Sequence, residues 1–179
     1  MTCWKTFNLS RDYGHHRVTL LSLITMLIAF ILLYLPLNLI YSSIYLNEDG
    51  ALMFLFFLIA IFPLHHFLHA VPLWISRKKV KMKFKRLFFF CPVLSIRCCQ
   101  SIPKKLSMIV YATPFFIVTS VILSASFMYP EYIHYFSIIG AINLGLCVTD
   151  FICINQFIKA PKMCVIEEID DGFDILLHE

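Results

Sequence analysis

The stretch Gly50–Ser76 reads GALMFLFFLIAIFPLHHFLHAVPLWIS and contains no formally charged residue. An α-helix rises about 1.5 Å per residue, so about 20 residues cross the hydrocarbon core of a bilayer. The stretch is therefore long enough to form a transmembrane helix. Three histidines interrupt its apolar character, at positions where polar side chains are costly to bury.

Three more uncharged stretches surround this segment. They run from Val18 to Asn47, from Leu106 to Pro130 and from Tyr132 up to Lys159, the last broken once by Asp150. None alternates as a barrel strand would. We predict an all-α membrane protein with four transmembrane helices, at about 18–40, 52–75, 106–129 and 134–158.

The composition of the whole chain agrees with this prediction. Of its 179 residues, 60% are hydrophobic and 15% are charged. A soluble domain is about 45–50% apolar and about one quarter charged. This surplus of apolar side chains excludes an ordinary soluble domain, and the length is that of a single domain.

The 15 Lys and Arg residues indicate the orientation. Three precede the first predicted span, ten lie between the second and third spans, and two follow the fourth. By the positive-inside rule, both termini, the basic loop 77–105 and the tail 163–179 are cytoplasmic. We interpret the basic loop as a contact with the lipid bilayer, not as a nucleic-acid site.

Two short segments outside the spans favour β-structure. Met82–Phe90 reads MKFKRLFFF and partly alternates basic with aromatic residues, which predicts a strand or an interfacial segment in the cytoplasmic loop. Asp170-Asp171-Gly172 separates the apolar-rich runs Cys164–Ile169 and Phe173–Leu177. An Asp-Gly pair in this setting predicts a C-terminal hairpin.

The polar residues inside the spans form a candidate site. His65 and His69 are four residues apart, so they share one helix face and can reach a common ion. Asp150 is the only acidic residue in a span, and it lies about as far from the cytoplasmic boundary as His69 does. Asn143 lies two turns before Asp150 on the same face and can hold a bound carbonyl or orient a ligand, which makes it a candidate for substrate positioning. His66 lies about 100° around the helix axis.

Two imidazoles and one carboxylate form a known zinc ligand set that leaves a fourth position open. The sequence leaves alternatives open: a structural network in which the histidines bond to neighbouring helices, haem ligation, or a proton relay. Haem needs an opposing axial ligand, and the remaining histidines stand at span ends or boundaries: His15, His16, His134 and His178.

The HHFLH of the second span, the basic loop and the run TDFICINQFIKAPK (149–162) before a β-like tail resemble a bacterial family of small membrane proteins. That family is of unknown function and is described as zincin-like peptidases. The resemblance extends from about Phe54 to the C-terminus and implies a multi-pass protein of the bacterial plasma membrane. A more distant resemblance is to the site-2 proteases, which implies zinc at His65, His69 and Asp150.

His66 departs from the HExxH motif of these peptidases, because it stands where the motif has its glutamate. That glutamate is the general base, and losing a general base typically costs 10²–10⁴-fold in rate. A neutral imidazole is a candidate replacement, with an ordinary pKa near 6.5.

Three functions remain open from the sequence. The first is a weak or degenerate membrane metallopeptidase that acts on a transmembrane or membrane-proximal peptide. The second is a non-enzymatic pseudo-protease or membrane interaction protein. The third is a small transporter or proton relay, which the absence of a visible internal repeat disfavours.

Overall fold

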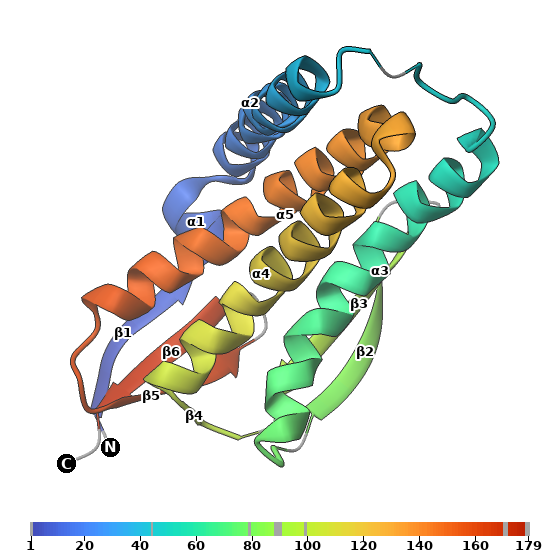
Figure 1. Cartoon of the computed structure of the whole chain (residues 1–179). Coiled ribbons are helices and arrows are strands. Elements are labelled where there is room, and N and C mark those ends of the chain that lie inside the picture. The colour runs from blue at the N-terminus through green and yellow to red at the C-terminus, as the bar shows by residue number, and fades with distance from the viewer. Residues whose placement is uncertain are drawn as a thin grey trace.

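The computed structural model describes residues 2–43, 45–78, 80–87, 91–98, 100–169 and 172–177. Within them, four long helices lie side by side: α2 (His15–Ile40), α3 (Ala51–Ile75), α4 (Lys104–Met128) and α5 (Ile133–Lys159) (Figure 1). Each is long and apolar enough to cross a membrane. The short 3₁₀ helix η1 (Pro130–Tyr132) joins α4 to α5. The predicted helical membrane fold is confirmed.

Helix α5 is the central helix of the group. It packs against α2 on one side and α4 on the other, whereas α3 packs mainly on α4 (Figure 1). In the most hydrophobic 18-residue stretch of each span, 56% of the residues are buried in the α5 span, compared with 6% in α2. Most side chains of α2 therefore face outward, as lipid-exposed side chains do.

Gly145 brings α2 and α5 close together. A Cβ atom at this position would lie 3.2 Å from the Cβ of Met26 and 3.2 Å from the carbonyl oxygen of Ser22. Small residues at helix interfaces let two backbones approach closely where lipid tails give no hydrophobic driving force. Gly145 thus supports the packing of α2 on α5.

A four-stranded antiparallel sheet covers the end of α5. Its order is β1 (Thr2–Asn8), β6 (Gly172–Leu177), β5 (Cys164–Ile169) and β4 (Ile102–Pro103). Strands β5 and β6 pair directly, with Ile169 opposite Gly172, so the predicted C-terminal hairpin is confirmed. Asp170 and Asp171, which we expected in its turn, lie outside the described residues.

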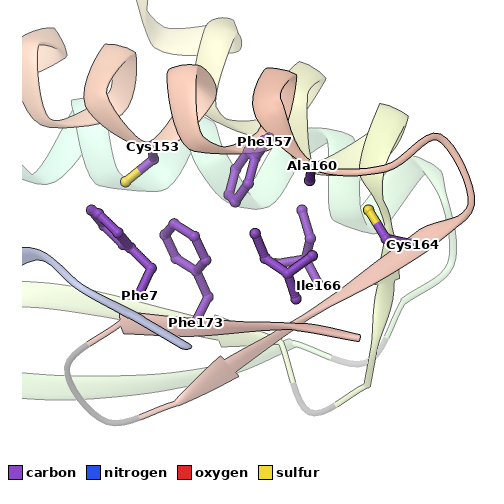
Figure 2. Packing of buried hydrophobic residues seen from close by; sticks show 8 residues of the cluster. Phe7, Cys153, Phe157, Ala160, Cys164, Ile166 and Phe173 are labelled. Atoms are coloured by element: carbon purple, nitrogen blue, oxygen red, sulfur yellow. The ribbon is translucent and has the colours of Figure 1, made fainter. Parts of the chain in front are cut away.

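Aromatic side chains attach this sheet to α5 (Figure 2). The Phe173 ring lies 4.8 Å from that of Phe7 and 4.7 Å from that of Phe157, between centroids. Phe7 and Phe157 are almost completely buried. The eight buried residues of this cluster are Phe7, Cys153, Phe157, Ala160, Cys164, Ile166, Phe173 and Ile175.

The N-terminal strand β1 is a feature that the sequence analysis does not predict. It pairs with β6, at the opposite end of the chain, and its last residue Asn8 lies opposite Gly172. A Cβ atom at position 172 would collide with the carbonyl of Phe7, so glycine permits this pairing. Strand β1 also contacts α5, because Lys5 Nζ donates to Gln156 Oε1 at 3.1 Å.

A short helix connects this strand to the first span. Helix α1 (Leu9–Tyr13) begins after Asn8, whose side chain accepts a hydrogen bond from the backbone N–H of Arg11 at 3.0 Å. This is an N-cap, which satisfies a backbone donor that has no partner within the helix. At the other end of α1, the Tyr13 hydroxyl accepts from Gln156 Nε2 at 3.0 Å. The whole N-terminal segment is therefore fixed to α5.

A second hairpin follows α3. Strands β2 (Val80–Leu87) and β3 (Cys91–Cys98) pair antiparallel, and β3 contacts α3, so the hairpin lies along that helix (Figure 1). This confirms the strand predicted at Met82–Phe90 as far as Leu87. Residues 88–90 lie outside the described part of the chain.

Candidate metal centre

Three side chains converge between α3 and α5. His65 Nε2 lies 3.2 Å from Asp150 Oδ2, and His69 Nε2 lies 3.5 Å from Asp150 Oδ1. One ligand atom from each residue can be chosen so that all three lie within 4.8 Å of one another. His65 is 2% exposed and Asp150 5% exposed, so the cluster is largely shielded from solvent.

The helix geometry of α3 places both imidazoles on the side of Asp150. His65 and His69 are separated by one turn, and their ring centroids lie 5.2 Å apart with the ring planes at 85°. Side chains at i and i+4 occupy one face of a helix. The nearly perpendicular rings let both Nε2 atoms face the same carboxylate.

The other nitrogen of each imidazole is held by a carbonyl oxygen. His65 Nδ1 lies 3.1 Å from Oδ1 of Asn143, and His69 Nδ1 lies 2.9 Å from the backbone oxygen of Val110. A carbonyl oxygen only accepts, so in these contacts each Nδ1 carries the proton and donates. Each Nε2 is then left with a lone pair directed toward the carboxylate.

This arrangement fits a divalent cation. Two Nε2 lone pairs and a carboxylate that face one another in a buried site repel unless a proton or a cation lies between them. Asp150 Oδ2 makes no hydrogen bond within the described residues although His65 Nε2 is close to it. Metal-bound histidines typically donate their second N–H to a carbonyl or carboxylate, as both do here.

The geometry also bears on the alternatives that the sequence left open. The Nδ1 atoms of the two histidines bond to neighbouring helices, as a structural network requires, but their Nε2 atoms converge on a single carboxylate. Both Nε2 atoms approach one carboxylate to within 3.5 Å, which leaves no space for a porphyrin plane between them. The donor set instead matches the two-histidine, one-carboxylate sites that bind zinc.

His66 lies beside the cluster but not in it. Its ring centroid is 5.6 Å from that of His65 and 6.4 Å from that of His69. The side chain is half-buried on α3, and Phe62, one turn earlier, lies on the same face of the helix. His66 thus borders the cluster without joining the three side chains that converge.

Asn143 occupies the second layer of the site. It is fully buried on α5, and its Oδ1 holds His65 while its Nδ2 has no hydrogen-bond partner in the described residues. The Oδ1 contact holds the His65 ring, whereas the substrate-positioning role that the sequence suggests for Asn143 stays a prediction. Asn143 Nδ2 carries two N–H donors, and neither has a partner in the described residues.

Helix α4 contributes two groups that sequence reasoning missed. The Val110 carbonyl is free to accept from His69 because the residue four positions later is Pro114, which has no N–H to donate. Pro114 within the span is the signal that could have revealed it. Tyr111 also borders the site, with its ring 5.5 Å from that of His69.

Comparison with known protein families connects this site to a class of proteins. A family model described as "Putative zincin peptidase" matches residues 58–165, which include the cluster, His66 and Asn143. The chain belongs to this family. Comparisons with curated proteins and with solved structures give no match. The resemblance to site-2 proteases stays a prediction.

The proline and the carbonyl that it frees give a first test of the site. In Pro114→Ala, the new N–H at position 114 competes with His69 for the Val110 carbonyl, and His69 loses its fixed orientation. Changes to such supporting contacts typically cost 10–100-fold in metal affinity. We expect zinc affinity, measured by competition with a chromogenic chelator, to fall about tenfold or more.

Pro36→Ala is the matched control, because Pro36 is also inside a spanning helix but on α2. Both substitutions replace proline by a better helix former, so a general change in helix stability affects them alike. An unchanged zinc affinity in Pro114→Ala would show that the Val110 carbonyl does not orient His69.

Proposed function

We propose that this chain is a membrane metalloprotein that binds one zinc ion through His65, His69 and Asp150 and has weak or degenerate peptidase activity. The observation that carries the proposal is the convergence of two Nε2 atoms on a buried carboxylate within 3.5 Å. Membership of the zincin peptidase family supports zinc as the metal and a peptide bond as the target.

Different residues of the chain have different roles at such a site. Zinc bound there supplies Lewis acidity toward a peptide carbonyl. Asn143 and the Val110 carbonyl hold the two imidazoles in the tautomer that leaves Nε2 free. His66 takes the place of the motif glutamate and accepts the proton of an attacking water before passing it to the leaving amine.

The substrate we propose is a transmembrane or membrane-proximal peptide. A cavity of about 360 Å³ lies between α2, α3 and α5. It contains Phe62, which shares a helix face with His66, and Thr149, which precedes Asp150. Most of the residues that line the cavity are apolar. The lining comprises Ser22, Leu23, Met26, Phe62, Ile142, Gly145, Leu146 and Thr149.

The alternative function is a pseudo-protease that binds membrane peptides without cutting them. The observation that favours it is His66 itself, because a neutral imidazole in an apolar site is a weaker base than the carboxylate that it replaces. The metal, the cavity and the peptide class would be the same in both functions. Only catalytic turnover of a peptide distinguishes the weak peptidase from the pseudo-protease.

We further propose that the protein is a multi-pass protein of the bacterial plasma membrane with both termini in the cytoplasm. The support is the placement of all 15 Lys and Arg residues on one side of the four spans. The sheet that joins both ends of the chain, and the metal cluster near it, are then on the cytoplasmic side.

Metal content tests the ligand set. We expect about one zinc per chain in the detergent-purified protein and little in His65→Ala/His69→Ala or Asp150→Asn. Asp150→Asn keeps the side-chain shape but removes the charge that balances the cation. The measurement is inductively coupled plasma mass spectrometry after reconstitution with zinc.

Asp174→Asn is the matched control, because Asp174 lies on β6, away from the cluster. Its zinc content is expected to equal that of the unchanged protein. Equal occupancy in Asp150→Asn and Asp174→Asn would remove Asp150 from the site.

Restoring the motif glutamate tests the assignment of His66. In His66→Glu, a carboxylate base returns to the position next to the ligands, and peptidase activity is expected to rise by about 10²–10⁴-fold. The assay is cleavage of a fluorogenic transmembrane peptide in detergent. His134→Glu, at the opposite end of α5, is the control and is expected to leave the rate unchanged. No gain with zinc still bound would contradict the assignment of His66 as the base.

The orientation has its own test. A reporter fused after Glu179 and one inserted at Gln100 are both expected to be active on the cytoplasmic side. A reporter inserted at Asp49, between α2 and α3, is expected to show the opposite location. An outside location for either of the first two would overturn the proposed topology.

A further inference from the structure

A second cavity lies where α3 ends and α4 begins, and its lining includes none of the groups of the metal centre. Its volume is about 640 Å³, and it lies between the end of α3, the first turns of α4 and the beginning of β5. The lining residues are Ser76, Pro103, Lys104, Lys105, Leu106, Ile109, Lys162, Met163, Cys164 and Val165. Neither the metal centre nor the proposed peptide cavity uses any of them.

One side of this cavity is strongly basic. Lys104, Lys105 and Lys162 line it, and the described lining residues include no Asp or Glu. Lys104 Nζ is held in place by the carbonyl oxygens of Ala160 at 2.6 Å and Ile158 at 3.2 Å. An ammonium group has three N–H donors, so one remains for a ligand. The Lys105 and Lys162 side chains are exposed.

The other side of the cavity is apolar and open. Ile109 is 56% exposed and Met163 79% exposed, and both line the cavity together with Leu106 and Val165. Lys105 and Ile109 are one helical turn apart, so the charge and the apolar surface lie on the same face of α4. The cavity thus offers a cationic end and an apolar end to a single ligand.

Its depth relative to the spans identifies the ligand class. Lys104 is the first residue of the spanning helix α4, and Ser76 directly follows the last residue of α3. The lysines therefore lie where the phosphate groups of a bilayer are found, and Ile109 lies about 7 Å deeper along the helix, at 1.5 Å per residue. A soluble phosphate would use only the cationic end.

We propose that this cavity binds an anionic phospholipid, with its phosphate at Lys104, Lys105 and Lys162 and the start of its acyl chains against Leu106 and Ile109. Basic pockets between spanning helices at the membrane surface are suited to lipid headgroups. The proposal does not depend on the metal or on peptidase activity. It concerns the leaflet on the side of the sheet.

Native mass spectrometry of the detergent-purified full chain tests the proposal. The probes are phosphatidylglycerol, phosphatidylcholine and glycerol phosphate, titrated separately. We expect phosphatidylglycerol to bind about tenfold more tightly than phosphatidylcholine, because only the former carries net negative charge. We expect glycerol phosphate to bind far more weakly, since it has no acyl chain.

Charge reversal identifies the site. Lys105→Glu/Lys162→Glu is expected to remove the preference for phosphatidylglycerol, a change of about tenfold or more. Lys104 is left intact because it holds the end of α5. Lys105→Gln/Lys162→Gln, which adds no negative charge, should lose part of the preference, and circular dichroism checks that both variants keep their helices.

The matched control is Arg17→Glu/Lys159→Glu, which changes the net charge equally at two exposed residues outside the cavity lining. This control is expected to keep the preference for phosphatidylglycerol. An equal loss in the control would mean that overall charge, not the cavity, attracts the lipid, and would overturn the proposal. Equal binding of the two lipids, or binding of glycerol phosphate as tight as that of the lipid, would also overturn it.

Discussion

A carboxylate in the interior of a membrane protein loses its hydration and needs a partner, and Asp150 finds two on a neighbouring helix. The approach of His65 and His69 to this group fixes how α3 lies relative to α5. Helix α3 packs mainly on α4, and its contacts with α5 include the stacking of Phe54 on Tyr135, with ring centroids 4.8 Å apart. The polar cluster is therefore the buried polar link between the second and fourth spans.

Helix α4 supports that link from the side. Its Val110 carbonyl holds His69 because Pro114 leaves that oxygen without a backbone partner. A proline that would weaken an isolated helix thus provides an acceptor inside the bilayer, where an unsatisfied carbonyl would be costly. Asn143 does the same for His65 from α5. The two imidazoles extend from α3 and are oriented by two different helices, so the cluster requires three spans in one arrangement.

Much of this could be predicted from the sequence because its signals are local. Charge-free stretches gave the four spans, the spacing of His65 and His69 gave their common face, and equal depth paired His69 with Asp150. The strand β1 could not be predicted, because its partner β6 lies at the far end of the chain and the match depends on Gly172 accommodating Phe7. The Val110 carbonyl was also missed, since a backbone oxygen has no residue type to indicate its role.

The sheet explains how the short segments at both ends of the chain stabilise a helix bundle whose first helix is mostly exposed. Phe173 packs between Phe7 and Phe157 near the end of α5, and Lys5 bonds to Gln156, one residue before Phe157. The N-terminal strand and the C-terminal hairpin thus both contact the central helix α5. Lys104, at the start of α4, holds the carbonyls at the end of that same helix. The last turn of α5 is therefore fixed by the N-terminal strand, the C-terminal hairpin and α4 together, about two turns from Asp150. Because a metal site tolerates little movement of its ligands, fixing this end of α5 is a structural condition for the cluster to keep its geometry.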